Sequence, residues 1–408
     1  MASPTSLHPI SGQPKQPDIP YHPDEAKWRA RTARRLAEDP CLPSTPLPEG
    51  FPKRLIGPLV WEGEQWADES LWAYSLSEEE LQEIDRAVRH FEDSGRPLTQ
   101  VDRTTFPLPK LSHTLHSLTI ELYAGRGFFV LRSIPTGLYT PYQNTLIYLG
   151  LSAHIAPTIA SQDPANGSML GHITDLRSKD ENGSSGAPAY MNVSQPFHSD
   201  PGDVVSLFAL GEAEEGGESK IASAWWVYNE LAETRPDLVK VLAEPFPLEM
   251  FNRDPPYQLR PFLFKCPHDD RIIIQNARRL CTGFEGLPRS PSVPPLTEAQ
   301  AEAIDALHFL AEKHCVRMKL RTGDIQYVSN LGLFHAREGF VDSPQKKRHL
   351  LRLWQRNEEL AWPTPPALEE RFKVLFKKVP VEKQRFPLEP DIRSISRGRG
   401  LDAKAKRA

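Results

Sequence analysis

Apolar residues recur every three to four positions in the first part of the chain, which is the spacing of amphipathic helices. The first such helix is predicted to begin at a capping box, Ser77-x-x-Glu80, and to end at Gly95. Its apolar face would consist of Leu81, Ile84, Val88 and Phe91. Further helices are predicted from Leu111, Leu115, Leu118 and Leu122, and over residues 145–154. We therefore expect this part of the folded chain to be largely helical.

Short apolar runs separated by turn residues follow, and they predict β-strands. These runs cover residues 128–131, 204–210, 219–223, 271–275, 316–321, 325–328 and 349–355. Helical patterns interrupt them at residues 225–242 and 297–314, the second after another capping box, Thr297-x-x-Gln300. Helices first and short strands later favour the α+β fold class, with a double-stranded β-helix (jelly-roll) core flanked by helices.

The two ends of the chain differ in composition from the middle. Residues 1–50 are rich in proline and poor in apolar side chains, so we expect a flexible arm with a short helix near residues 29–35. Residues 393–408 carry six Lys or Arg and one Asp, which favours a disordered basic tail. The folded domain is expected over residues 55–375.

Composition and charge restrict the classes of partner. The chain of 408 residues has a formal net charge of -4, which provides no basic field for nucleic acid or for anionic membrane surfaces. No apolar run approaches the roughly 18 residues of a membrane span, and no signal-peptide pattern opens the sequence. The four cysteines form no Cys-x-x-Cys pair, so a reducing, cytoplasmic compartment is expected. A small molecule is the expected partner, and the pattern does not indicate an oligomeric state.

The pattern His-x-Asp occurs three times, and only its surroundings distinguish the copies. The first copy, at residues 22–24, lies in the proline-rich arm, where no framework would hold a metal. The second, at residues 268–270, separates two apolar runs and is interpreted as the tip of a hairpin. The third pairs His198 with Asp200, just before the strand predicted at residues 204–210. Because alternate residues of an extended chain project to the same side, both side chains can reach one ion.

A distal segment supplies candidates that would complete such a site. His335 follows the predicted strand at residues 325–328 after a loop, and Arg348 immediately precedes the apolar run at residues 349–355. Two histidines and one carboxylate are the ligand set of a non-haem iron(II) facial triad. An arginine on the next strand offers a guanidinium that can donate two parallel hydrogen bonds to one carboxylate of a dicarboxylic acid. The neighbouring His349 is interpreted as a packing or hydrogen-bonding residue.

The motifs follow one another in a specific order. They are His-x-Asp, Gly-Gly-Glu-Ser at residues 216–219, Gly-Asp-Ile at residues 323–325, His-Ala-Arg, and Arg-His-Leu-Leu-Arg-Leu-Trp at residues 348–354. With this order and spacing the chain resembles the taurine dioxygenase (TauD/TfdA) superfamily of iron(II)- and 2-oxoglutarate-dependent oxygenases, and most closely a branch common in filamentous fungi. The resemblance covers residues 55–375, which would form one TauD/TfdA-like jelly-roll oxygenase domain.

The resemblance implies a role for each motif residue. The residues that would hold iron(II) are His198, Asp200 and His335. Arg348 would bind the distal carboxylate of 2-oxoglutarate with help from the Ser219 hydroxyl. Arg348 lies 13 residues after His335, a slightly longer gap than in the taurine enzyme, so Arg352 competes with it for this role. Arg352 is alternatively a contact to the prime substrate or a structural residue.

The substrate side departs from the taurine enzyme. Ser194 stands where that enzyme has a substrate-contacting asparagine, which argues against taurine as the substrate. Gln162 and His172 fall in segments that the family brings towards the iron, so they are either substrate contacts or ordinary solvated residues. The prime substrate is expected to be a small or medium organic molecule, with anions among the options.

The reaction implied by the resemblance is hydroxylation of an unactivated C–H bond, with 2-oxoglutarate and O2 as co-substrates and succinate and CO2 as products. Desaturation and ring closure are other outcomes of the same chemistry. One alternative is a catalytically silent binding protein on the same barrel. Another is a cupin-type metalloenzyme that does not use 2-oxoglutarate, against which the pairing of Ser219 with Arg348 counts. No Walker A, Gly-x-Gly-x-x-Gly or Gly-x-Ser-x-Gly motif supports a nucleotide enzyme or an α/β-hydrolase.

Overall fold

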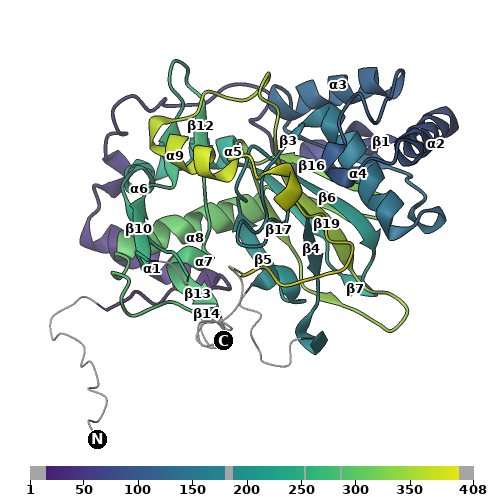
Figure 1. Ribbon diagram of the computed structural model, residues 1–408. Helices are drawn as coiled ribbons and strands as arrows, with labels where there is room; N and C mark the ends of the chain where they lie inside the picture. Colours follow the sequence, from purple (N-terminus) through teal and green to yellow (C-terminus); the bar gives the residue numbers. More distant parts are fainter. Residues whose placement is uncertain (1–14, 180–186, 252–253, 285–286, 395–408) are drawn as a thin grey trace, which may run out of the picture.

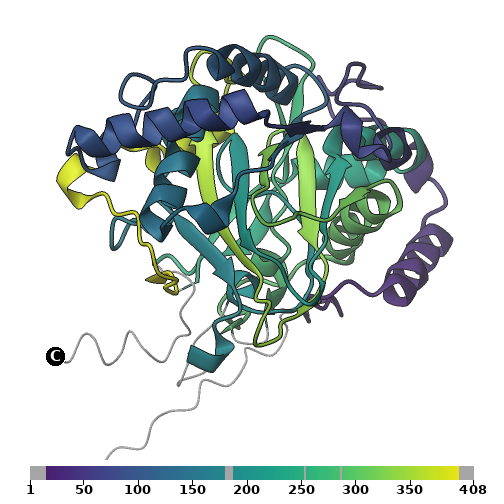
Figure 2. The same cartoon turned by 90° about the vertical axis from the view of Figure 1, so that its right-hand side faces the viewer.

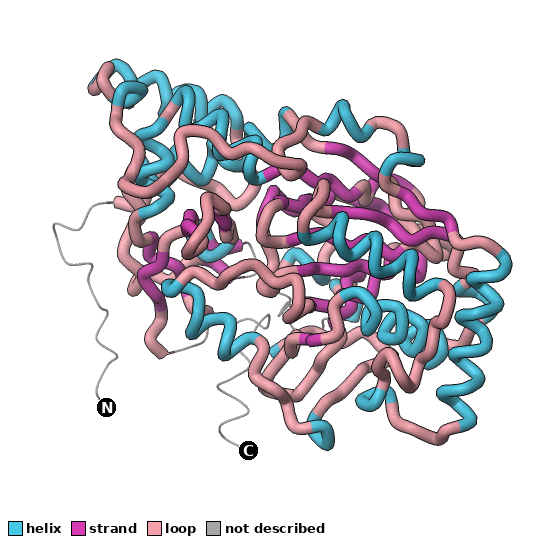
Figure 3. Tube along the Cα trace, turned by 90° about the horizontal axis from the view of Figure 1, so that it is seen from above, coloured by secondary structure: helices cyan, strands magenta, loops and turns pink. Residues whose placement is uncertain are grey.

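Two β-sheets form the centre of the molecule, and helices lie around them (Figures 1 and 3). The structure, a computed structural model, describes residues 15–179, 187–251, 254–284 and 287–394. The larger sheet has the strand order β1-β2-β16-β6-β19-β3, with β4 also paired to β19, and the smaller sheet has the order β15-β8-β17-β5. The predicted α+β fold class with a two-sheet jelly-roll core is confirmed.

The strands have the following bounds. The larger sheet contains β1 (Ala73–Ser75), β2 (Phe128–Arg132), β3 (Thr158–Ile159), β4 (Gly171–Thr174), β6 (Val204–Gly211), β16 (Ile325–Ser329) and β19 (His349–Arg356). The smaller sheet contains β5 (Gln195–His198), β8 (Ser219–Ser223), β15 (Val316–Met318) and β17 (Leu333–Arg337). Four short pairs are β7 (Glu215–Gly216) with β18 (Phe340–Val341), β9 (Phe246–Glu249) with β10 (Tyr257–Arg260), β11 (Leu263–Lys265) with β12 (Ile272–Ile274), and β13 (Gly283–Phe284) with β14 (Leu287–Pro288).

Helices cover the outer faces of both sheets. The α-helices are α1 (Glu25–Glu38), α2 (Glu78–Asp93), α3 (Leu111–Tyr123), α4 (Pro141–Ile155), α5 (Ala224–Thr234), α6 (Pro236–Ala243), α7 (Arg279–Thr282), α8 (Glu298–Lys313) and α9 (Pro366–Leu375). Short 3-10 turns occur at Leu42–Ser44, Gly63–Trp66, Glu69–Leu71, Leu98–Gln100, Thr136–Leu138, Arg177–Lys179, Pro188–Tyr190 and Val381–Lys383. α3 packs against β2 and β16, whereas α8 packs against β5 and β8. Within the described ranges, no helix has the length and apolar character needed to cross a bilayer.

Local sequence signals determine where the predicted helices begin and end. Both predicted capping boxes form, with Ser77 capping α2 and Thr297 capping α8. The helix predicted over residues 225–242 is in fact two helices, α5 and α6, which meet at Pro236. Proline lacks the backbone N–H that would continue α5, but it is well suited to the first turn of a new helix.

The segment before residue 50 is packed against the domain from residue 15 onwards, although the sequence predicts a flexible arm. Arg31 of α1 is buried, and its guanidinium binds Asp305 at 2.7 Å and Glu298 at 2.9 Å, both on α8. Trp28 stacks on Phe309 of α8, with 4.9 Å between the ring centroids. α1 accordingly lies beside α8 in Figures 1 and 2. Composition did not predict this packing because a few long-range contacts, rather than many apolar residues, hold the segment.

The two extreme ends of the chain, residues 1–14 and 395–408, lie outside the described residues, so most of the predicted basic tail does too. Ser394 is described, and its N–H and hydroxyl both donate to the Asp163 carboxylate at 2.6 Å. Arg393 donates from its backbone N–H and its Nε to the Tyr190 hydroxyl, both at 3.1 Å. The chain around residue 393 is therefore attached to the barrel.

The attachment of α1 leads to a stability prediction. Arg31→Ala should lower the free energy of unfolding by about 2 kcal/mol, because it removes charge-assisted hydrogen bonds from a buried site. Arg29→Ala is the matched control on the same helix, since Arg29 is exposed and pairs with Glu25 one turn away. The control should change stability by no more than about 0.5 kcal/mol. Urea denaturation of both variants checks the difference, and equal midpoints would contradict the packing of α1.

Candidate active site

His198 and His335 are cross-strand neighbours in the smaller sheet. β17 pairs antiparallel with β5, and the register places His335 directly opposite His198. Their ring centroids are 4.2 Å apart. As the sequence predicts, His335 follows a strand and a loop, and it lies within the next strand, β17, whose five residues are all buried. Its position inside the sheet gives the ring a defined direction.

Asp200 reaches the same point from the bend that follows β5. Its backbone N–H donates to the Asn330 Oδ1 at 2.9 Å, and the Asn330 amide in turn donates to the carbonyls of Asp200 and Gly202. Asn330 is buried, so this clamp holds the bend in one conformation. One ligand atom each from His198, Asp200 and His335 lies within 4.8 Å of the others, as the third His-x-Asp copy predicts.

Hydrogen bonds to neighbouring groups leave the metal-facing atoms available. His198 Nδ1 lies 2.9 Å from the Pro196 carbonyl, which places the proton on Nδ1 and the lone pair on Nε2. The Asp200 Oδ2 accepts from Arg352 Nη1 at 2.8 Å and from Trp354 Nε1 at 2.9 Å. The other carboxylate oxygen, Oδ1, lies 4.0 Å from His198 Nε2. This donor set, with a buried and unpartnered Nδ1 on His335, fits a divalent iron ion.

The protonation states also suit metal binding. Burial lowers the pKa of His335 to about 3, and the adjacent His198 contributes to the shift. Burial likewise lowers the pKa of His198, although Asp200 opposes this effect. For Asp200, burial alone would raise the pKa, but Arg352 and the two histidines hold the pKa of the carboxyl well below its usual range. Both imidazoles are therefore neutral and the carboxylate is ionised at pH 7, as metal ligation requires.

A narrow cationic cavity between the two sheets extends inward from the triad. Ser219, Arg337 and Arg348 line it together with the two histidines. Arg348 is buried and stacks on the Phe340 ring, and its Nη1 has no partner among the residues that the structure describes. Burial and the charge of Arg337 both lower the pKa of Arg348 well below its usual value. An anion bound in this cavity would lower the electrostatic free-energy cost of keeping the Arg348 guanidinium charged in a buried site.

The Gly-Gly-Glu-Ser turn makes room for Arg348. Gly217 has a φ of +78°, in the left-handed region that favours glycine, and a Cβ on it would lie 2.8 Å from the Arg348 Nε. Two residues later, the Ser219 hydroxyl lies 3.1 Å from the Gln326 side chain and faces the same cavity. The turn that seemed unremarkable in the sequence thus shapes the cavity that contains Arg348.

Arg352 is engaged differently from Arg348. Besides Asp200, it binds the Gln162 Oε1 through Nε at 3.2 Å and through Nη2 at 3.0 Å. Gln162 therefore positions Arg352, which in turn positions the carboxylate ligand. His172 binds His349 at 2.8 Å and the Pro387 carbonyl at 2.8 Å, which agrees with the expectation that His349 is a hydrogen-bonding residue.

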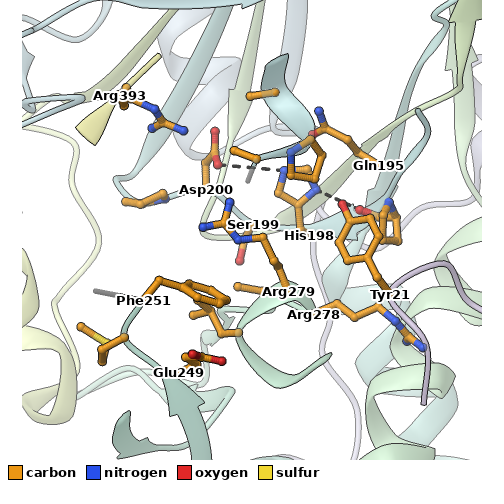
Figure 4. Close-up of a pocket in the computed structure, with 18 of the residues that line it drawn as sticks. Tyr21, Gln195, His198, Ser199, Asp200, Glu249, Phe251, Arg278, Arg279 and Arg393 are labelled. Atoms are coloured by element: carbon orange, nitrogen blue, oxygen red, sulfur yellow. Dashed lines mark hydrogen bonds and ion pairs between the residues drawn. The ribbon is translucent and has the colours of Figure 1, made fainter. Parts of the chain in front are cut away.

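A second cavity of about 300 Å³ opens on the other side of His198 and Asp200 (Figure 4). Its walls come from segments far apart in the sequence, including Tyr21 near the amino terminus, Arg279 of α7 and Arg393 near the carboxyl end. The other side chains and turns that line it include Pro196, Pro201, Glu249, Met250, Phe251, Leu280 and Trp354. Neither Ser194 nor His172 lines this cavity. It has the size and mixed polarity of a small-molecule site.

The other two His-x-Asp copies lie outside the triad, the later one as the predicted hairpin tip and the earlier one in a segment that packs against the domain instead of forming the predicted flexible arm. Residues 268–270 form the tip of the antiparallel hairpin between β11 and β12, and His268 has a left-handed φ of 71°. His22 packs against Tyr21 and approaches the Ser194 hydroxyl at 3.4 Å. Neither copy belongs to the group of candidate metal ligands that the described residues contain.

Sequence reasoning missed several residues that shape the site. Trp354 lies two positions after the predicted Arg352 on β19 and so projects to the same side, a signal that alternation along the strand contains. Arg337 lies two residues after His335 on β17 and donates to the carbonyls of Pro188 and Met191 at 3.3 and 2.8 Å. Asn330 had no recognisable signal, because its role depends on a turn that meets Asp200 only in the folded chain.

The fold and the site define a class of protein. Two neutral histidines and one carboxylate converge inside a two-sheet jelly roll, beside a buried cavity with an unpaired arginine. This combination is that of a non-haem iron(II) oxygenase with a facial triad. The three candidate ligands come from two segments more than a hundred residues apart, and only the folded chain brings them together.

Comparison with known proteins identifies the family. The family model described as "Taurine catabolism dioxygenase TauD, TfdA family" matches residues 94–354. The taurine hydroxylase-like protein SAT17 of Stachybotrys chartarum is 32% identical over 345 residues, which cover 83% of this chain and 89% of that protein. The FR-33289 synthase of Streptomyces rubellomurinus is 27% identical over 312 residues, covering 74% and 90%. The chain therefore belongs to the TauD/TfdA family of iron(II)- and 2-oxoglutarate-dependent dioxygenases, as its motifs predict.

Solved structures agree with the fold. Asparagine oxygenase in complex with Fe(II), 2S,3S-3-hydroxyasparagine and succinate has a TM-score of 0.54 and 15% identity, over 70% of this chain and 93% of that chain. The non-heme iron oxygenase OrfP in complex with Fe and alpha-ketoglutaric acid has a TM-score of 0.51 and 16% identity, over 70% and 94%. At these identities the similarity extends to the fold alone.

Proposed function

We propose that this protein hydroxylates an unactivated C–H bond of a small organic substrate. His198, Asp200 and His335 hold iron(II) in this proposal, while Arg348 and Ser219 bind the distal carboxylate of 2-oxoglutarate. When bound, the iron supplies O2 activation coupled to oxidative decarboxylation of 2-oxoglutarate to succinate and CO2. The observation that carries the proposal is the convergence of three candidate ligand atoms beside the buried Arg348, whose Nη1 has no partner among the described residues.

The protein's own residues have separate tasks in this mechanism. Arg352 and Trp354 both donate to the Asp200 Oδ2, so they fix the carboxylate and leave Oδ1, which lies 4.0 Å from His198 Nε2, as the oxygen that would bind iron. Arg348 and Arg337 neutralise the dianionic co-substrate in the inner cavity. The larger outer cavity orients the prime substrate and excludes water from it. Since Asp200 provides the carboxylate ligand, we favour hydroxylation over halogenation.

We further propose that the substrate is a small organic anion and that the reaction takes place in the cytoplasm. Arginines outnumber carboxylates along the outer cavity, which favours a negatively charged ligand. All four cysteines are free and two of them are buried, which is usual in a reducing compartment. We assign the regions outside residues 55–375 no catalytic chemistry apart from the few residues that line the outer cavity.

Two other functions predict different behaviour. A silent binding protein on this barrel would not need an intact set of unprotonated ligands, and a cupin-type metalloenzyme would not need the Arg348 cavity. Conversion of 2-oxoglutarate to succinate by the iron-loaded protein, measured without added prime substrate, distinguishes the three. Slow, iron-dependent succinate formation is expected. No succinate despite tight iron binding would favour the cupin-type enzyme, and no iron binding would favour the silent protein.

The Trp354 indole, one of two donors to the Asp200 Oδ2, allows a test of whether these hydrogen bonds support iron binding. Trp354→Phe should weaken iron(II) binding by about 10-fold, because Asp200 loses one of the two donors that orient it. Trp72→Phe is the matched control, since the buried Trp72 indole donates to the Trp66 carbonyl outside the site. Anaerobic iron(II) titration with a competing chelator measures both affinities. An unchanged affinity in Trp354→Phe would remove Trp354 from this role.

A further inference from the structure

We propose that Arg279 and Arg393 form a subsite that binds the acidic group of the prime substrate, beyond the iron ligands and the co-substrate cavity. The inference rests on the proposed function of the outer cavity and specifies how that cavity selects its ligand. The two arginines come from different parts of the chain, α7 and the segment that follows α9, and meet in the outer cavity. Figure 4 shows both guanidinium groups directed into it, towards the side where Asp200 lies.

Among the described residues that line the outer cavity, the charge balance is positive. The arginines that line it are Arg278, Arg279, Arg352, Arg371 and Arg393, and the carboxylates are Asp200 and Glu249. Arg352 is paired with Asp200, and Arg278 is paired with Asp305 on α8 at 2.7 Å. Glu249 accepts a hydrogen bond from the Ser290 backbone at 2.9 Å. Over the described part of the chain, Arg279 and Arg393 form no ion pair.

Aromatic rings, rather than carboxylates, support these two arginines. The Arg279 guanidinium lies over the Phe251 ring at 4.8 Å, and that of Arg393 lies over the Trp354 ring at 5.4 Å. Stacking fixes the plane of a guanidinium while leaving N–H groups available for a ligand. The Arg393 Nε already donates to the Tyr190 hydroxyl, so this arginine offers its two Nη groups. Side chains held in this way are ready to donate paired hydrogen bonds to an oxyanion.

The two guanidinium groups also repel one another, which a shared anion would relieve. Burial and the charge of Arg393 lower the pKa of Arg279 to about 10, while Glu249 and the tyrosines Tyr21 and Tyr190 oppose this shift only in part. Arg279 is still protonated at neutral pH. An oxyanion placed between the two groups would satisfy both forks and remove the like-charge repulsion.

The subsite indicates a class of substrate. A carboxylate, sulfonate or phosphonate all present oxygens that two arginines can share, so the ligand is a small organic acid of one of these types. The apolar walls at Pro196, Pro201, Met250 and Leu280 would cover its carbon chain. Because His198 and Asp200 line the same cavity, that chain would extend from the two arginines towards the iron ligands.

Calorimetric titration of the full-length protein tests the subsite without knowledge of the natural substrate. The probes are hexanoate, hexanesulfonate and hexylphosphonate, with hexanol as the neutral isostere, each added with and without iron(II) and 2-oxoglutarate under anaerobic conditions. At least one of the anions should bind at least 10-fold more tightly than hexanol. Arg279→Gln and Arg393→Gln should each lower the affinity for that anion by about 10- to 100-fold, the usual range for loss of a charge-assisted hydrogen bond. Arg34→Gln, on the exposed side of α1, is the control and should leave the binding unchanged.

The outcomes separate this inference from the proposed function. The subsite is overturned if no anion binds better than hexanol, or if both arginine variants bind the anion like the wild type. It is also overturned if Arg348→Gln, rather than the Arg279 and Arg393 variants, abolishes binding, because the anion would then occupy the inner cavity. Failure of the proposed function would instead leave anion binding intact while iron and 2-oxoglutarate had no effect on it. The two arginine variants are independent, so misfolding of one does not prevent the test.

Discussion

Asp200→Ala is expected to abolish substrate-dependent succinate formation, with a loss well above about 100-fold. Removal of a residue that only hydrogen-bonds to a metal ligand lowers metal affinity or activity by about 10- to 100-fold. Asp200→Ala removes the ligand itself, so its effect should be larger. His198→Ala should have the same effect, because it also leaves only two ligands in the triad. Coupled measurement of succinate and of iron affinity, together with circular dichroism to verify the fold, checks the expectation.

The control for this prediction is a second buried aspartate three residues away. Burial raises the pKa of Asp203 to about 7, and its carboxylate lies 3.4 Å from Arg356, outside the triad. Because the Asp203 carboxyl is only partly ionised at neutral pH, Asp203→Asn changes the charge of the protein little. The variant should therefore leave the iron(II) affinity unchanged. Normal turnover in Asp200→Ala or His198→Ala would exclude the assigned metal centre.

Arg348→Ala should produce the second-largest effect, a steep rise in the concentration of 2-oxoglutarate needed for turnover. Truncation of one partner of a buried, hydrogen-bonded charge pair costs about 2 to 5 kcal/mol, or roughly 30-fold to several thousand-fold in apparent affinity. The effect should be on the KM for 2-oxoglutarate, because Arg348 lines the inner cavity and not the outer one. Initial rates at varied 2-oxoglutarate concentration measure it.

Arg352→Ala is the matched comparison, an arginine of β19 four residues after Arg348. Arg352 binds Asp200 and Gln162 and borders both cavities, so its loss should act on iron affinity and on the prime substrate more than on 2-oxoglutarate. If Arg352→Ala raised the KM for 2-oxoglutarate while Arg348→Ala left it unchanged, the two arginines would have exchanged roles. That result would leave the metal centre as assigned and change only the co-substrate site.

Much of the fold was predictable because its signals are local. Capping boxes marked α2 and α8, and apolar runs marked most strands of the two sheets. The alternation of an extended chain also placed His198 and Asp200 on one side, although the pattern occurs three times. Its surroundings, above all the following strand and the later His335, identified the copy that the structure brings together.

What the sequence did not reveal depends on contacts between distant segments. The packing of α1 depends on a buried pair between Arg31 and Asp305, 274 residues apart, in a segment whose composition is typical of a flexible arm. The same is true of the outer cavity, in which Arg279 and Arg393 meet. No periodicity or motif links residues so far apart, and each arginine alone resembles an ordinary surface residue.

The most direct test of the proposed metal and co-substrate site is anaerobic visible absorption of the full-length protein with iron(II) and 2-oxoglutarate. A charge-transfer band should develop only when both are present, because the band requires the keto acid to chelate the iron that His198, Asp200 and His335 hold. The band should be lost in His198→Ala. Absence of the band in the wild-type protein, or an unchanged band in His198→Ala, would contradict this site.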